Sequence, residues 1–171
     1  MADEKKAYFA GGCFWCVEEA FEKTAGVSEV KSGYTGGHLK NPTYEQVTHE
    51  ETGHYEAVEV SYDPNQISYD QLLEIFWKNI DPFDAQGQFC DKGSSYLSAV
   101  FYQNEQEKEA FNKSKENLKI DKSQIATHLK PFETFYAAED YHQDFYKKNP
   151  LRYKFYKSSC GRVPRLKKIW G

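Results

Sequence analysis

The feature that most constrains the fold is a strand followed directly by a helix near the middle of the chain. Residues 55–62 are rich in residues that favour strands, and the turn at 63–65, Asp-Pro-Asn, ends that strand. Residues 68–71, Ser-Tyr-Asp-Gln, then form a capping box, and apolar side chains recur at helical spacing as far as Ile80. The chain must therefore accommodate strands and helices around one core.

The same patterns give the order of the other elements. Further strands are predicted at 6–9, 27–34 and 96–102, and further helices at 13–22 and 104–120. The resulting order, βαββαβα, predicts an α+β fold: the split βαβ arrangement of a ferredoxin-like α/β plait with an antiparallel sheet. Additional elements are expected as an extended segment at 125–137 and a helix at 138–148. After Pro150 we expect an irregular tail.

The length of 171 residues suits one catalytic domain spanning 1–171, and no linker divides it. The formal net charge of −4 is unevenly distributed, because the segment from Lys147 to Gly171 contains nine basic residues and no acidic ones. A basic tail can bind nucleic acid. Its aromatic residues instead indicate that residues 150–171 wrap on the acidic body of the same chain. We expect a monomer with no nucleic-acid partner.

The cysteines and the start of the chain bear on the cellular compartment. No apolar run approaches the roughly 20 residues of a membrane span. The charged start, Met-Ala-Asp-Glu-Lys-Lys, does not resemble a secretory leader. Four cysteines without such a leader are typical of a reducing compartment. We therefore expect a cytoplasmic protein without membrane contact.

The hexapeptide Gly-Gly-Cys-Phe-Trp-Cys at 11–16 is the strongest functional signal. Cys13 lies at the predicted junction of strand and helix, where backbone N–H groups and the helix dipole favour a thiolate. Phe14 and Trp15 place two aromatic faces beside that sulfur, which indicates an apolar binding pocket. Two other interpretations stay open: the cysteines are buried structural residues, or Cys13 and Cys16 belong to a zinc site.

The spacing of the candidate ligands disfavours zinc. There is no second Cys-x-x-Cys, and Cys90 and Cys160 lie far apart in the chain. The segment from His49 to His54 resembles a zinc-protease helix only superficially, because its histidines are five residues apart and Gly53 interrupts it. We expect no metal and no bound cofactor.

A candidate acid lies at the start of the strand at 55–62. Glu56 alone could be a solvated residue at a strand edge, but Tyr44 precedes it, and the loop before the next strand supplies Asp91 and Tyr96. Apolar surroundings would keep such a carboxylic acid protonated, and phenols beside it would complete a proton-donating site for an S=O or C=O oxygen. That site would complement a thiolate nucleophile.

Six motifs spread over nearly the whole chain resemble the family of A-type peptide methionine sulfoxide reductases, which act on the S epimer of methionine sulfoxide. The motifs are Gly-Cys-Phe-Trp at 12–15, Ser-Gly-Tyr-Thr-Gly-Gly at 32–37, Asn-Pro-Thr-Tyr at 41–44, Thr-Gly-His-Tyr-Glu-Ala at 52–57, Ala-Glu-Asp-Tyr-His-Gln at 138–143 and Lys-Asn-Pro at 148–150. The resemblance implies an α/β plait and the repair of oxidised methionine, either free or within proteins.

The resemblance also implies a role for individual residues. Cys13 corresponds to the nucleophile that attacks the sulfoxide sulfur, and Glu56 to the acid that protonates its oxygen. Cys13 is left as a sulfenic acid, a second thiol converts it to a disulfide, and thioredoxin or a small dithiol such as dithiothreitol reduces that disulfide. The residues expected around the substrate, the first two at its S-methyl group, are Phe14, Trp15, Tyr44, Asp91 and Tyr96.

The second thiol is where the chain departs from many relatives. Many have glycine at the position of Cys16, and a glycine-rich tail with two cysteines where this chain has only Cys160. Cys16 lies within disulfide reach of Cys13, whereas Cys160 lies among basic residues that favour its thiolate. Both are candidate resolving thiols, with Cys160 favoured to act first or to receive the disulfide from Cys16. Cys90 is interpreted as structural.

Two other functional classes remain as alternatives. A thioredoxin-like thiol-disulfide oxidoreductase would also use a Cys13-x-x-Cys16 pair, but it would need Cys16 for all activity and would not need Glu56 or Tyr44. A non-enzymatic binding module with a basic tail would bind nucleic acid, which the acidic body disfavours.

Overall fold

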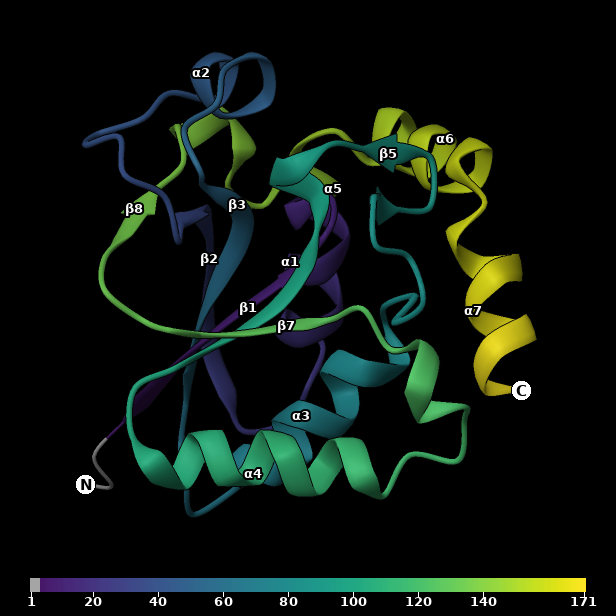
Figure 1. Cartoon of the computed structure of the whole chain (residues 1–171). Coiled ribbons are helices and arrows are strands. Elements are labelled where there is room, and N and C mark those ends of the chain that lie inside the picture. The colour runs from purple at the N-terminus through teal and green to yellow at the C-terminus, as the bar shows by residue number, and fades with distance from the viewer. Residues whose placement is uncertain (1–3) are drawn as a thin grey trace.

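The computed structural model describes residues 4–171, and its central feature is a six-stranded sheet (Figure 1). The strands are β1 (Lys5–Gly11), β2 (Val27–Thr35), β3 (Tyr55–Tyr62), β4 (Gly87–Gln88), β5 (Asp91–Lys92), β6 (Ser98–Tyr102), β7 (His128–Pro131) and β8 (Phe135–Ala137). The α-helices are α1 (Phe14–Glu22), α2 (Tyr44–His49), α3 (Tyr69–Lys78), α4 (Glu105–Glu116), α5 (Phe145–Lys148), α6 (Pro150–Cys160) and α7 (Arg162–Trp170).

The main sheet has the strand order β7-β6-β1-β3-β2-β8, and β4 pairs with β5 in a separate hairpin. Among the four inner strands, β6, β1, β3 and β2, every adjacent pair is antiparallel, as the split βαβ arrangement requires. β7 extends one edge parallel to β6, and β8 extends the other edge antiparallel to β2. The predicted α+β plait with additional elements is confirmed.

Helices α1 and α3 pack on one face of the sheet around an aromatic cluster. The ring centroid of Phe9 on β1 lies 5.0 Å from that of Phe21 on α1 and 5.4 Å from that of Phe76 on α3. All three side chains are fully buried. Burying one such side chain contributes ~1.5–3 kcal/mol, so this cluster fixes both helices against β1. Helix α4 packs outside α3, where Trp77 donates its indole N–H to Ser114 at 2.6 Å.

The chain between β7 and β8 crosses the opposite face of the sheet (Figure 1). Tyr8, which alternates with Phe9 along β1, stacks its ring on Phe132 at 3.8 Å and approaches Phe135 at 5.7 Å. Because successive side chains of a strand point to opposite faces, β1 contributes to the packing on both sides of the sheet. The second half of β1, from Ala7 to Gly11, is buried, and the site described below lies at this end of the strand.

The C-terminal segment is helical, so the prediction of an irregular tail after Pro150 is wrong. Pro150 stands at the start of α6, where its missing N–H costs nothing, and Gly161 with φ +78° separates α6 from α7. Apolar side chains lie on both sides of α6: Tyr153 is buried, whereas Leu151 and Phe155 are exposed. The sequence therefore has no single apolar stripe by which the helix could be recognised.

The prediction that the tail wraps on the acidic body of the same chain is confirmed. Lys157 on α6 pairs with Glu19 on α1 at 2.8 Å. Arg165 on α7 pairs with Asp81, which follows α3, at 2.9 Å. The two C-terminal helices are thus held against two different elements of the plait.

The segment 138–148 was predicted as one helix, but the structure does not form a continuous helix there. It contains only a 3₁₀ turn, Asp140–His142, and the short helix α5. Gln143 donates to the backbone carbonyls of Ser32 and Ala138 at 2.8 and 3.0 Å, and Asp144 has φ +54°. The long-range bond to Ser32 on β2 and the local bond to Ala138 are formed in place of a continuous helix.

Other elements differ from the predictions in smaller ways. Helix α2, which was not predicted, begins at a capping box formed by Thr43 and Gln46. Helix α4 ends at Glu116 instead of residue 120, and the extended segment at 125–137 contains β7 and β8. Among residues 4–171, no helix has the length and apolarity needed to cross a membrane.

We predict that Gly12→Ala destabilises the protein more than Gly161→Ala. Both glycines have positive φ, +85° and +78°, which costs an L-residue about 1–2 kcal/mol. Only at Gly12 would the added Cβ collide with a neighbour, lying 2.5 Å from the Cβ of Gln88. Such overpacking costs a further ~1–3 kcal/mol. Urea unfolding measures both free energies, and equal losses would contradict the role assigned to Gln88.

Candidate active site

The site is built at the junction where β1 ends and α1 begins. Gly12 turns the chain with φ +85° and is packed against Gln88. Cys13 follows as the N-cap residue of α1 and is only 8 % exposed. The structure therefore places Cys13 between a strand and a helix, where the sequence predicted it.

Cys13 and Cys16 are neighbouring free thiols on the first turn of α1. The backbone N–H of Cys16 donates to the carbonyl of Cys13 at 3.2 Å. Burial raises the pKa of the Cys13 thiol well above its ordinary value, and its hydrogen bond with Cys16 and the charges of Glu56 and Asp91 raise it further. Cys13 is therefore the member of the pair that holds its proton.

The pKa of Cys16 shifts in the opposite direction. Its hydrogen bond with Cys13 lowers the pKa, burial opposes this, and the positive charges of Arg162 and Lys157 lower it further. The helix dipole was expected to favour a thiolate at Cys13. The surrounding charged groups instead favour the thiolate at Cys16, because the cations lie on its side of the pair.

Glu56 is a carboxyl group buried inside the site. It lies on β3, is 1 % exposed, and accepts a hydrogen bond from the backbone N–H of Phe14 to Oε1 at 3.2 Å. Its other oxygen, Oε2, is buried without a hydrogen-bond partner. Burial raises the pKa of Glu56 to about 8, against the opposing effect of the Phe14 N–H and with the help of the Asp91 charge. The Glu56 carboxyl is therefore protonated at neutral pH, and it can act as a proton donor close to Cys13.

The phenols expected beside Glu56 face it from two other elements. Tyr44 is the first residue of α2, and Tyr96 ends a 3₁₀ turn before β6. Burial, followed by the charge of Glu56, raises the pKa of Tyr44 to about 12, and the same two causes raise the pKa of Tyr96. Both hydroxyls therefore remain hydrogen-bond donors at neutral pH.

The two aromatic residues of the hexapeptide differ in exposure. Phe14 is 1 % exposed and lies with its ring centroid 5.1 Å from that of His142. Trp15 is half-buried, stacks on Phe145 at 3.8 Å, and donates its indole N–H to Nδ1 of His142 at 3.1 Å. Trp15 is thus the more accessible of the two rings, and Phe14 is covered.

Two residues that shape the site, Glu139 and His142, were given no role from the sequence. Glu139 accepts hydrogen bonds from the hydroxyl of Tyr34 at 2.9 Å and from the backbone N–H of Tyr44 at 3.0 Å. Burial lowers the pKa of His142 to about 4, so its neutral ring accepts the bond from Trp15. Both residues belong to the motif at 138–143, and that motif is the sequence feature from which their role could have been predicted.

Asp91 connects the site to α6. It lies on β5, is half-buried, and accepts a hydrogen bond from the hydroxyl of Tyr156. Burial raises the pKa of Asp91, although the bond from Tyr156 and the charge of Arg162 oppose this shift. The hydroxyl of Tyr156 also lies against the Cys13 thiol. Helix α6 is therefore part of the site, not only a cover over it.

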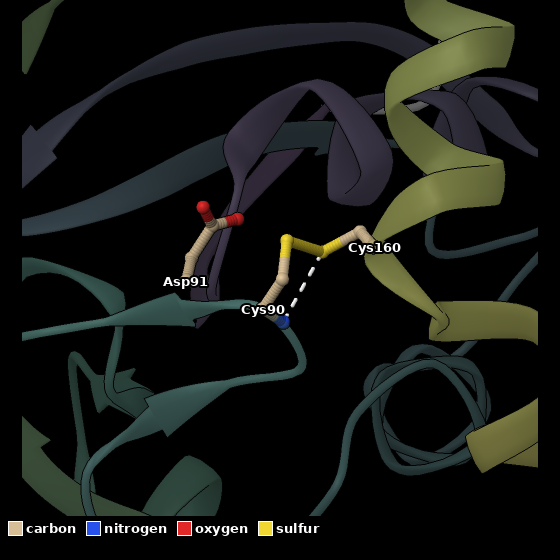
Figure 2. A group of neighbouring side chains, drawn as sticks. All are labelled: Cys90, Asp91 and Cys160. Atoms are coloured by element: carbon tan, nitrogen blue, oxygen red, sulfur yellow. Dashed lines mark hydrogen bonds between the residues drawn. A yellow bond between two sulfur atoms is a disulfide. The ribbon is translucent and has the colours of Figure 1, made fainter.

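Cys160 does not lie free over the pocket, because it is joined to Cys90 in a disulfide (Figure 2). The two Cα atoms are 4.9 Å apart, and the backbone N–H of Cys90 donates to Sγ of Cys160 at 3.2 Å. Cys90 is exposed and Cys160 is half-buried. Of the two candidate resolving thiols, the structure brings only Cys16 to Cys13.

The described residues include two groups whose ligand atoms are close enough to share an ion, Cys90 with Asp91 and Cys160, and Glu18 with Glu22 and Asp144. The disulfide occupies both sulfurs of the first group. In the second, Glu18 accepts the backbone N–H of Asp144 at 2.8 Å and Glu22 pairs with Lys147 at 2.9 Å. We assign no metal to either group.

Comparisons with known proteins indicate one family over nearly the whole chain. A family model for peptide methionine sulfoxide reductase matches residues 5–171. The peptide methionine sulfoxide reductase MsrA of Bacillus subtilis is 50 % identical over 175 aligned residues, covering 100 % of this chain and 99 % of the relative. The family matched is not that of the thioredoxin-like oxidoreductases, so that alternative is dropped.

Solved structures are similar as well. Mxr1 from Saccharomyces cerevisiae in its reduced form has a TM-score of 0.81 at 31 % identity, covering 88 % of this chain and 90 % of that chain. Mxr1 in complex with Trx2 has a TM-score of 0.59 at 24 % identity, covering 85 % and 88 %. The second similarity bears on the fold alone.

The raised pKa of Glu56 predicts that stability falls as the pH rises. The pKa is about 8 in the folded state and 4.5 ordinarily, so between these values the folded state holds a proton that the unfolded state has released. The free energy of unfolding must then decrease from about pH 5 to about pH 8, by ~1.4 kcal/mol for each unit of difference.

The measurement is urea unfolding at several pH values, comparing the wild type with Glu56→Gln. In Glu56→Gln the free energy of unfolding should decrease less as the pH rises, because the contribution of the Glu56 proton is absent. Glu18→Gln should remove a separate part, because burial also raises the pKa of Glu18 to about 8. The assignment is contradicted by the same pH dependence in the wild type and Glu56→Gln.

Proposed function

Because the chain belongs to the peptide methionine sulfoxide reductase family, we propose that it reduces the S epimer of methionine sulfoxide with Cys13 as nucleophile and Glu56 as proton donor. Thiol-dependent reduction of methionine sulfoxide is the activity of the family. The observation that carries the residue assignment is the 3.2 Å bond from the Phe14 N–H to Glu56. It holds a buried, protonated carboxyl beside the residue that follows Cys13.

The proposed chemical step balances within the site. The sulfur of Cys13 attacks the sulfoxide sulfur while Glu56 gives its proton to the oxygen. The hydroxyl group then moves to the sulfur of Cys13, as the S–O bond of the substrate and the transient bond between the two sulfurs break. The thiol proton of Cys13 restores Glu56, and the products are methionine and the sulfenic acid of Cys13. Tyr44 and Tyr96 donate hydrogen bonds to the oxygen as charge develops on it.

The remaining pocket residues bind the substrate in this proposal. Trp15 and Phe14 contact the S-methyl group, because they offer apolar surface next to Cys13. Asp91 supports the polar side, where its bond from Tyr156 holds it beside the thiol pair. A free amino acid and a residue in an oxidised protein both present this same methyl sulfoxide group, and we propose both as substrates.

We assign the resolving step to Cys16. Its thiolate attacks the sulfur of the Cys13 sulfenic acid, the hydroxyl leaves as water after taking a proton, and a Cys13–Cys16 disulfide forms. Residues three apart at a helix start have Cα atoms about 5 Å from each other, which a disulfide spans. Two observations support the choice: the lowered pKa of Cys16 and the engagement of Cys160 with Cys90.

The disulfide must be reduced by an external dithiol, and we propose thioredoxin for this role. Mxr1, which in its reduced form is 31 % identical to this chain, has also been solved in complex with Trx2, and this supports the proposal. The free thiols Cys13 and Cys16 are in keeping with a reducing compartment, so we also propose a cytoplasmic location. We propose that the protein acts as a monomer.

Incubation of the protein with racemic methionine sulfoxide and dithiothreitol should consume the S epimer and leave the R epimer, as chiral chromatography would show. Cys13→Ser should form no methionine, because no other thiol occupies its position. Cys16→Ser should still complete a single turnover and should fail to form the Cys13 disulfide that mass spectrometry detects in the wild type. Consumption of the R epimer alone would overturn the proposal.

Glu56→Gln should lower kcat/KM by about 10²- to 10⁴-fold, the usual contribution of a positioned acid. The wild-type rate should fall as the pH rises through about 8, because the carboxyl loses its proton there. The variant should lack this fall. Glu59→Gln, on the same strand but bonded to Tyr8 on the other face of the sheet, is the matched control. A wild-type rate that does not change across pH 8 would count against Glu56 as the donor.

A further inference from the structure

We propose that Glu18 is a positioning residue that keeps the methyl pocket narrow, because it fixes the segment 142–145 that holds the ring of Trp15. This inference rests on the proposed function, in which Trp15 contacts the S-methyl group of the substrate. Glu18 lies on α1, three residues after Trp15, and its side chain is fully buried. The proposed chemical step makes no use of it.

Two side chains of the segment 142–145 hold the ring of Trp15. Phe145 stacks on this ring, with the centroids 3.8 Å apart and an interplanar angle of 9°. His142 accepts the indole N–H of Trp15 at Nδ1, at 3.1 Å. A half-buried tryptophan side chain without such contacts can occupy more than one rotamer. The segment therefore determines where the ring lies beside Cys13.

The middle of the segment is anchored to two different elements. The side-chain amide of Gln143 donates to the carbonyl of Ser32 on β2 at 2.8 Å, and its oxygen accepts the N–H of Ser32 at 2.9 Å. The backbone N–H of Asp144 donates to Oε1 of Glu18 on α1 at 2.8 Å. Helix α5, which follows Asp144, lies beside α1 (Figure 1). Of these bonds, the one to Glu18 ties the segment to the helix that carries Trp15.

Asp144 has a backbone conformation that needs support from its surroundings. Its φ and ψ are +54° and 33°, in the left-handed region that residues with a side chain rarely adopt. Its carbonyl accepts the N–H groups of Lys147 and Lys148 at 2.9 and 3.0 Å, so α5 begins from it. A strained backbone persists where surrounding contacts fix it, and Glu18 supplies the contact to this N–H. Without that bond the start of α5, with Phe145, would shift relative to α1.

Glu18 performs this role through an oxygen atom and not through a negative charge. Burial raises its pKa to about 8, and the charge of Glu22 raises it further, so the carboxyl is protonated at neutral pH. Its second oxygen, Oε2, is buried and has no hydrogen-bond partner among the described residues. Because Oε2 makes no bond, an amide nitrogen in its place breaks none. A glutamine therefore keeps both the acceptor and the neutral state, whereas a methionine of similar length removes the acceptor.

The test measures how strictly the pocket accepts a methyl group. It compares kcat/KM for methionine-S-sulfoxide with kcat/KM for the S epimer of ethionine sulfoxide, which carries one more methylene, with dithiothreitol as the reductant. A pocket fitted to a methyl group rejects the extra methylene by ~10- to 200-fold. The wild type should show a preference of this size, and its absence would contradict a narrow pocket.

Glu18→Met should reduce the preference for the methyl substrate toward equality. It should also raise KM for methionine-S-sulfoxide with little change in kcat, because the pocket holds the methyl group in the ground state and in the transition state alike. Glu18→Gln should retain the wild-type preference. An unchanged preference in Glu18→Met, or an equal loss in Glu18→Gln, would overturn the inference.

Glu22→Gln is the matched control. Glu22 lies on the next turn of α1 and also contacts α5, but through the side chains of Tyr146 and Lys147, at 2.8 and 2.9 Å. It makes no contact of this kind with the backbone N–H of Asp144, which Glu18 holds. The control should keep the wild-type preference. A loss equal to that in Glu18→Met would show that any weakened contact between α1 and α5 opens the pocket, and would overturn the role given to Glu18.

Hydrogen exchange of the wild type tests the contact without a variant. The amide of Asp144 should exchange slowly, because it is paired with a fully buried carboxyl. Rapid exchange of this amide would overturn the inference even if Glu18→Met did not fold. Failure of the proposed function would be recognised separately, because the wild type would then form no methionine from methionine-S-sulfoxide.

Discussion

The rest of the structure depends on how the backbone polar groups at the β1–α1 junction are satisfied. A helix leaves its first N–H groups without internal partners, and Cys13, the N-cap residue of α1, offers no side-chain cap. Glu56 accepts the N–H of Phe14 instead. On the strand side, Arg162 donates to the carbonyl of Gly11. Segments 42 and 151 residues away from the junction are therefore fixed to it by the requirement that buried polar groups be paired.

This junction also explains the distribution of charge around the thiols. Glu56 and Asp91 come from the sheet side, whereas Arg162 and Lys157 come from the C-terminal helices. The pKa of a thiol that lies between acidic and basic residues is raised when the acidic residues are nearer and lowered when the basic residues are nearer. Burial adds to this at Glu56, where it outweighs the favourable N–H and raises the pKa to about 8. The basic residues of the tail thus lower the pKa of one thiol, Cys16, while the acidic residues of the body raise the pKa of the other, Cys13.

The sequence allowed the prediction of whatever depends on short-range patterns. The strand at 55–62 and the capping box at Ser68 lie where they were predicted, because alternation, turn residues and caps are local signals. Helix α6 was missed, since its apolar residues face both the body and the solvent. The bond between Cys90 and Cys160 spans 70 residues, and no local pattern encodes it. Candidate site residues such as Tyr44, Glu56 and Tyr96 were predicted by residue type and by resemblance, but their mutual placement required the fold.

The proposed chemistry demands a site from which water is excluded. A carboxyl group stays protonated near neutral pH only where water is excluded, which requires Cys13 and its neighbours to be buried. Helix α6 supplies part of this burial, because its Tyr153 and Tyr156 pack against Cys13 and Cys16. The end of the same helix is fixed to the β4–β5 hairpin by the disulfide between Cys160 and Cys90. The helical form of the tail therefore lets one element cover both thiols while it is anchored at its far end.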